Sequence, residues 1–331
     1  MKEVEVIGYS QQAQINVFLN RIRYRMPHFH NVLELSLSLE ESSEWTILGQ
    51  NRRIRPGDIV LLNPNQLHEI HAPQEACLNL YIQFPPSLFT HTVPAMVDIH
   101  FDKTIIRPED GPYYENLRDL ILAFSILYLQ KEETYPFSAI SLFYLIMDQL
   151  IQHVDHRFLS PEEAYKQKTE ADRISRLMDF IQDGYTLPIR LQDFAETEGL
   201  SLSYTSRFIK EKTNKTFQHL VKEYRLIRAQ NLLITGKYSL TDLAYLAGFS
   251  DLRYMREAFM ELLGTTPEAY ALSPDEKSRL PFNQATDSFS IEQKLSNEEA
   301  IRCLKPLLPN DKDKLRKILE AYLMPYSQNE E

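Results

Sequence analysis

A short sequence pattern that occurs twice between residues 169 and 273 is the strongest constraint on how this chain folds. The first copy begins at Leu191 and the second at Leu240, 49 residues later, and Leu, Asp, Ala, Gly and Ser recur at matching positions. An internal repeat of this kind indicates two copies of one structural unit. Gly199 and Gly248 match each other, and glycine allows the positive φ that a sharp reversal between helices needs. Each copy therefore predicts a helix-turn-helix unit, whose second helix fits the major groove of DNA.

The second helix of each unit is predicted to have one apolar and one polar face. In the first unit the spacing of Thr205, Phe208 and Ile209 buries one stripe, and hydroxyl and basic side chains occupy the other. Residues 217–234 predict a long amphipathic helix that holds the two units at a fixed separation. The outward groups suit base edges and phosphates, and we expect DNA contacts from Ser203, Tyr204, Ser206, Arg207, Lys210, Arg253, Tyr254 and Arg256.

Further residues in both units keep a characteristic spacing. They are Ala195, Gly199, Leu200, Ser201, Tyr204 and Arg207 to Lys210 in the first unit, and Ala244, Gly248 to Ser250, Tyr254, Phe259, Gly264, Thr266, Pro267 and Tyr270 in the second. With these residues the block 169–273 resembles the DNA-binding domain of the AraC family of bacterial transcription regulators. The resemblance implies a sequence-specific regulator whose partner is double-stranded DNA, with RNA polymerase as a further partner.

The block is unusually acidic for a DNA-binding domain. Residues 169–273 hold 13 Lys and Arg against 14 Asp and Glu. Neutralisation of phosphates supplies most non-specific affinity for DNA, so binding outside the specific site should be weak. The second unit has Met260-Glu261 and Ala271 where the family usually has basic residues, and we expect it to contribute less than the first. A large share of the contact then falls to Arg207, Lys210, Arg253 and Arg256.

The composition fits a multi-domain regulator in the cytoplasm. The chain has 331 residues, enough for two or three domains, and its net charge of −10 argues against broad binding to nucleic acid or anionic membranes. Cys77 and Cys303 lie far apart without a metal-binding pattern, as expected in a reducing compartment. The first residues lack the apolar core of a signal peptide, and no apolar stretch is long enough to span a bilayer. We therefore expect no membrane association.

Residues 1–110 are predicted to form a β-barrel or sandwich. Short alternating segments separated by turn-rich pieces are typical of such folds, and they lie at residues 14–19, 32–39, 45–48, 58–62 and 78–84. His28, His30 and Glu34, followed by Gly57-Asp58, Pro64 and His68, resemble the two motifs of the cupin family. In metal-dependent cupins the three histidines and the glutamate bind a divalent metal, which imidazole and carboxylate ligands suit.

Three interpretations of this motif remain open. We favour a pocket at the barrel mouth that binds an effector without metal or other cofactor, because sensor cupins joined to AraC-type domains commonly use the pattern in this way. Aromatic rings cover the C–H faces of a sugar and polar groups bind its hydroxyls. We therefore expect a sugar or glycoside at His28, His30, Glu34, Trp45, His68 and Tyr81. The alternatives are a divalent metal held by His28, His30, Glu34 and His68, and histidines with purely structural roles.

Two other classes of function compete with an effector-controlled regulator. A metal-dependent cupin enzyme, such as an isomerase or dioxygenase with a helical appendage, explains the four candidate ligands but leaves the tandem repeat unexplained. A partner-binding regulator whose barrel is filled by side chains needs no small molecule. We predict that the chain is not an enzyme and has no catalytic residues.

The remaining segments complete a multi-domain α+β chain with an all-α C-terminal domain. Helical spacing over residues 111–157 predicts two antiparallel amphipathic helices that cover the barrel and form a homodimer. Residues 158–168 are a polar linker to the block 169–273. Residues 274–331 form a helical extension outside the family pattern, with a capping box at Ser296, and we expect its helices to pack on the chain itself or on a partner subunit. Effector binding would favour one dimer arrangement and so alter half-site geometry.

Overall fold

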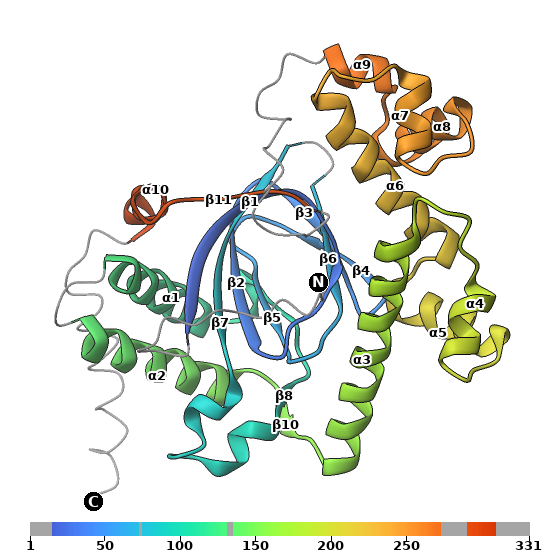
Figure 1. The fold of residues 1–331 in the computed structure, drawn as a ribbon. Coiled ribbons are helices and arrows are strands. Elements are labelled where there is room, and N and C mark those ends of the chain that lie inside the picture. The colour runs from blue at the N-terminus through green and yellow to red at the C-terminus, as the bar shows by residue number, and fades with distance from the viewer. Residues whose placement is uncertain (1–14, 73–74, 131–134, 273–289, 309–331) are drawn as a thin grey trace, which may run out of the picture.

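The N-terminal part of the protein is a curled antiparallel β-sheet (Figure 1). The computed structural model describes residues 15–72, 75–130, 135–272 and 290–308. Within these ranges the strands run in the order β4-β3-β6-β1-β7-β2-β5-β9, and β11 pairs with β1. The bounds are β1 (Asn16–His28), β2 (Leu33–Glu40), β3 (Ser43–Ile47), β4 (Gln50–Ile54), β5 (Ile59–Leu62), β6 (His68–His71), β7 (Cys77–Phe84), β9 (Ile105–Ile106) and β11 (Ser290–Lys294). The predicted α+β architecture with an N-terminal barrel is confirmed.

The strands β1, β4 and β6 differ from the sequence prediction for physical reasons. β1 continues to His28 because its first half pairs with β7 and its second half with β6, and a register shift between Arg25 and His28 interrupts the alternating pattern. β4 was not predicted, since four of its five residues are exposed at the edge of the sheet. β6 was also missed because its four residues, His-Glu-Ile-His, are mostly polar although three of them are buried.

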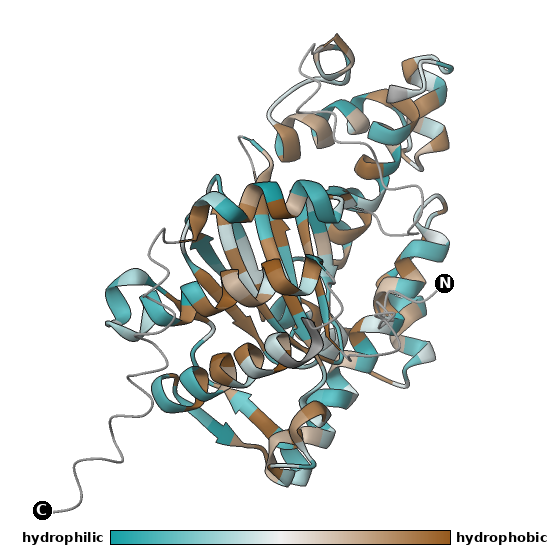
Figure 2. Ribbon diagram, turned by 90° about the vertical axis from the view of Figure 1, so that its left-hand side faces the viewer, coloured by the Kyte–Doolittle hydropathy of each residue, from teal (hydrophilic) through white to brown (hydrophobic). Residues whose placement is uncertain are grey.

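The sheet separates two apolar clusters, because successive side chains of a strand point to opposite faces. This alternation is visible as brown and teal bands along the strands (Figure 2). Leu78, Leu80 and Ile82 face outward and pack against α1 (Tyr113–Gln130) and α2 (Tyr135–His153). Trp45 and Tyr81 face the barrel interior, where they join a second cluster of buried side chains. Large side chains thus fill this part of the barrel.

A single helix, α3 (Pro161–Gly184), leads from the barrel to the repeat block. Residues 161–168, which we expected to form a polar linker, are its first turns, and Ser160 and Glu163 form a capping box at its start. Among the described residues, no helix is both long and apolar enough to cross a membrane. The helices after α3 are α4 (Leu191–Thr197), α5 (Leu202–Thr213), α6 (Phe217–Ile234), α7 (Leu240–Leu246), α8 (Leu252–Leu263) and α9 (Pro267–Leu272).

The two helix-turn-helix units, α4–α5 and α7–α8, are present as predicted and are joined by α6 over the expected range. Ser201 caps α5, and its side chain accepts a hydrogen bond from the Tyr204 amide. Asp251 caps α8 in the same way, one position later than Ser250, which matches Ser201 in the repeat. The starts of α5 and α8 are therefore separated by one residue more than the two turns that precede them. Both helices end in the left-handed conformation, at Asn214 and Gly264, which asparagine and glycine adopt more readily than other residues.

The C-terminal extension returns to the barrel. β11 adds to β1, and the capping box at Ser296 starts α10 (Asn297–Leu304) as predicted. Ala300 and Leu304 are buried in the cluster that contains α1. The strand was not predicted, and most of the predicted helical extension, residues 274–289 and 309–331, lies outside the described residues. The short elements are β8 (Ile99–Phe101), β10 (His156–Phe158) and the 3-10 turns η1 (Pro86–Phe89), η2 (Pro94–Asp98), η3 (Pro108–Asp110) and η4 (Lys305–Leu307).

Candidate DNA-binding and effector sites

The second helices of the two units, α5 and α8, present equivalent surfaces. The sequence of buried and exposed positions along residues 203–210 is identical to that along residues 253–260. All eight side chains expected to contact DNA are exposed. The hydroxyl of Tyr204 accepts a hydrogen bond of 3.3 Å from Arg173 of α3. This bond fixes the Tyr204 side chain against α3. Both helices can therefore offer the same kind of face to a groove.

The basic residues on these faces have local partners. Arg207 lies 3.8 Å from Glu211, and Arg253 lies 3.9 Å from Glu257. Arg256 is held at 2.5 Å by Glu268 of α9, and Lys210 donates to the Asn214 carbonyl at 2.7 Å. Because acidic neighbours reduce the positive potential of the faces, weak attraction to DNA in general is the expected result.

The six residues expected to bind an effector lie in or beside the barrel interior. Trp45 and Tyr81 are buried, and the indole of Trp45 donates to the Ser43 hydroxyl at 3.0 Å. The ring of His68 stacks on Trp45 with ring centroids 6.0 Å apart, and the ring centroids of His28 and His68 lie 4.0 Å apart. None of the six lines either of two cavities that lie between the barrel and the helices of the C-terminal half, so their role as effector contacts remains a prediction.

Glu34 is the centre of a buried hydrogen-bond network in the barrel. Its carboxylate accepts from Gln83 at 2.7 Å and from Ser36 at 3.1 Å, and His30 Nε2 lies 3.0 Å away. Burial opposes ionisation, but the charge and hydrogen bond of His30 outweigh it and lower the pKa of Glu34 to about 2. Burial lowers the pKa of His68 to about 4, so His68 is neutral at pH 7.

The donor geometry fits a divalent metal at three of the four residues proposed for one. His30, Glu34 and His68 offer ligand atoms within 4.8 Å of one another, whereas His28 is outside this group. Nδ1 of His30 and of His68 faces a backbone carbonyl at 3.0 Å, which leaves Nε2 of each ring for a ligand. His68 Nε2 is buried without a hydrogen-bond partner among the described residues. A bound metal would take up this lone pair and replace a proton between His30 and Glu34.

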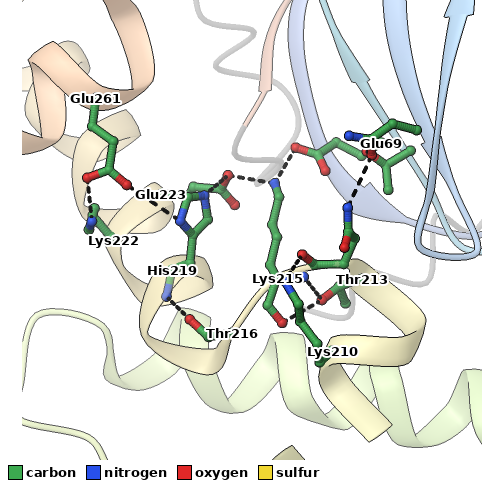
Figure 3. Close-up of polar contacts among 12 residues, drawn as sticks. Glu69, Lys210, Thr213, Lys215, Thr216, His219, Lys222, Glu223 and Glu261 are labelled. Carbon is green, nitrogen blue, oxygen red and sulfur yellow. Dashed lines mark hydrogen bonds and ion pairs between the residues drawn. The ribbon is translucent and has the colours of Figure 1, made fainter. Parts of the chain in front are cut away.

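A polar network joins the barrel to the repeat block, and the sequence analysis missed it. Lys215, between α5 and α6, reaches Glu69 of β6 and binds Glu223 of α6 at 2.5 Å (Figure 3). His219 Nε2 lies 3.3 Å from the same oxygen of Glu223. The sequence offered one signal: Glu223 is a charged residue on the buried face of an amphipathic helix.

The pKa values in this network diverge. Burial raises the pKa of Glu69, and Lys215 opposes the shift without cancelling it. Glu223 is equally buried, but hydrogen bonds and charges from His219 and Lys215 lower its pKa. Of the pair, Glu223 is therefore the stronger acid.

Two cavities adjoin this junction. The larger, of about 1260 Å³, lies between the barrel and helices α5, α6, α8 and α9. The smaller, of about 320 Å³, lies between the barrel and α3. Neither cavity was predicted from the sequence, because their walls combine side chains from segments far apart in the chain.

A ligand-binding-type barrel joined to tandem helix-turn-helix units defines a class of transcription regulator. Two family models match the chain: an AraC-like ligand-binding domain over residues 19–147 and a helix-turn-helix domain over residues 194–272. Together they account for more than half of the chain, in the order seen in the structure. The chain belongs to the AraC family of transcription regulators, and it is a regulator and not an enzyme.

Individual relatives are similar over different shares of their length. The uncharacterized regulator YdeC of Bacillus subtilis is 23% identical over 251 residues, 73% of this chain and 84% of YdeC. The activator RhaR of Pectobacterium carotovorum is 32% identical over 105 residues, which cover 31% of this chain and 37% of RhaR. Among solved structures, fatty-acid-bound ToxT of Vibrio cholerae has 12% identity and a TM-score of 0.38, covering 80% of this chain and 97% of that chain.

Proposed function

We propose that this regulator works in the cytoplasm as a homodimer and binds a specific operator through both units, under the control of a sugar or glycoside. The observation that carries the proposal is the repeated exposed face of α5 and α8, attached through one helix to a ligand-binding-type barrel. We propose that the effector binds at His28, His30, Glu34, Trp45, His68 and Tyr81, where polar groups and aromatic rings lie side by side. Because large side chains fill this part of the barrel, effector binding would displace some of them.

The proposed dimer uses the helical pair α1–α2. On α2 the side chains of Ile140 and Tyr144 are 44% and 40% exposed, one turn apart. A second copy of the helix would bury them as part of a small bundle. Dimerisation doubles the DNA contacts and offsets the weak attraction of each acidic block. RNA polymerase is the further partner that an activator of this class would contact.

The direct test is fluorescence anisotropy of the purified protein on DNA from upstream of its own gene. At about 150 mM salt, where exposed charges are largely screened, we expect saturable binding that exceeds binding to scrambled DNA. One member of a sugar panel should change the affinity. If selective DNA binding occurs but no sugar alters it, the sugar part of the proposal is wrong and the regulator part stands.

Arg207→Ala should weaken binding to the specific site by about 1–3 kcal/mol if Arg207 reads a base. Arg190→Ala is the matched control, because Arg190 is more exposed yet precedes α4 and lies outside the second helix. We expect the control to bind like the unmodified protein. An equal loss for Arg207→Ala on scrambled DNA would instead identify a phosphate contact.

A further inference from the structure

The larger cavity has walls from both halves of the protein. Tyr24, Glu69 and His71 come from β1 and β6 of the barrel, and Lys215 and Glu223 come from the repeat block. β11 of the C-terminal extension also contributes, through Ile291. Any molecule bound here would contact the barrel and the repeat block at once.

The deep part of this cavity has an excess of buried acid. The side chains of Glu69 and Glu223 are 7% and 6% exposed, and both share the single ammonium group of Lys215. In each carboxylate the oxygen Oε2 is buried without a hydrogen-bond partner among the described residues. The buried Tyr24 hydroxyl beside them has a single proton and can serve only one of the two oxygens. A buried acceptor without a donor is costly, so at least one oxygen is suited to a ligand that donates hydrogen bonds.

The other residues around the cavity limit which hydrogen-bonding ligand can bind there. Among the more exposed lining residues the two cations Arg23 and Lys210 outnumber Glu44, so the excess acid is confined to the buried pair Glu69 and Glu223. One part of the remaining wall is apolar and suits a hydrocarbon body, with Leu226, Ile227, Leu262, Leu263 and Tyr270 lining it. A carboxylate ligand would meet like charge at Glu69 and Glu223. A metal ion is disfavoured because the cavity does not assemble three metal-binding groups among the described residues.

We propose that this cavity binds a small organic cation, an amine or guanidine with an apolar body, whose N–H groups donate to Glu69 and Glu223. Its charge would add to that of Lys215 at Glu69, because Glu223 already faces His219 as well as Lys215. Because Glu69 belongs to the barrel and Glu223 to α6, the ligand would favour the arrangement in which the two halves are docked. This site is separate from the barrel interior, so its ligand would be a second molecule that controls the regulator.

The test is isothermal titration calorimetry of the full chain with 2-phenylethylamine, compared with 2-phenylethanol and phenylacetate. We expect 1:1 binding of the amine and at least tenfold weaker binding of the alcohol and the acid. Glu69→Gln and Glu223→Gln should each weaken amine binding at least tenfold. Glu261→Gln is the control, because Glu261 pairs with Lys222 and His219 but does not line the cavity.

A blocking variant keeps the test decisive if a glutamine variant fails to fold. Ala269 of α9 is exposed and lines the cavity, so Ala269→Trp should fill part of it without disturbing a core. We expect this variant to lose amine binding. The proposal is overturned if the amine shows no saturable binding at millimolar concentration, if phenylacetate or phenylethanol binds as tightly, or if binding survives the glutamine and tryptophan changes. DNA binding is measured separately, so failure here leaves the regulator assignment intact.

Discussion

Gly248→Ala should destabilise the second helix-turn-helix unit by about 3 kcal/mol or more, whereas Gly199→Ala should cost about 1–2 kcal/mol. Both glycines have positive φ, 89° and 65°, so both substitutions meet the penalty for a left-handed residue with a side chain. A Cβ at Gly248 would also lie 2.7 Å from the Thr186 Cα and 2.7 Å from the Tyr185 carbonyl oxygen. At Gly199 nothing lies within 4 Å.

The clash at Gly248 involves backbone atoms, which cannot move aside as a flexible side chain would. Arg225 of α6 holds the same segment, because it donates to the Tyr185 carbonyl at 2.7 Å and to the Leu187 carbonyl at 3.0 Å. The turn of the second unit is therefore packed against the chain that enters the first. Displacing it should alter the relative position of α5 and α8 and reduce affinity for a two-part operator.

Urea unfolding followed by far-UV circular dichroism would measure this difference between the two glycine variants. The fluorescence of Trp45, the single tryptophan of the chain, is a control because it is buried in the barrel. We expect the barrel transition to change little in either variant. Equal losses of helical stability for the two variants would contradict the role of the Thr186 contact.

Lys215→Ala should cost about 3 kcal/mol, because it leaves Glu69 and Glu223 buried without their shared cation. Lys222→Ala is the matched control on the same helix block. Lys222 Nζ lies 2.7 Å from Glu261 Oε2, but the two side chains are 36% and 49% exposed. Loss of this ion pair should therefore cost less than about 1 kcal/mol. The midpoint of urea unfolding, monitored by both Trp45 fluorescence and circular dichroism, would measure both changes.

The raised pKa of Glu69 predicts how the loss of stability in Lys215→Ala depends on pH. Burial already raises the pKa of Glu69, and removal of Lys215 raises it further. A carboxyl whose folded pKa is above its unfolded value destabilises the protein at high pH and is relieved as it takes up a proton. The loss in Lys215→Ala should therefore shrink as the pH is lowered toward about 5. Adding Glu69→Gln should recover part of the stability at pH 7, and an unchanged loss in this double variant would show that the pair is not the cause.

The sequence alone determined the features that depend on local chemistry. The turns at Gly199 and Gly248 and the full extent of α6 follow from neighbouring residues, and the structure bears them out. The barrel was predicted from alternating strands, but β4 and β6 were missed because their polar residues give no such alternation.

The tertiary structure decided what depends on contacts between distant segments. Gly199 and Gly248 are equivalent in the repeat, yet Gly248 alone packs against the backbone of Thr186. In the same way, Glu69 and Lys215 are separated by 146 residues and meet where the barrel touches the repeat block. A periodic pattern records which side of an element is buried, but it does not record which other element covers that side.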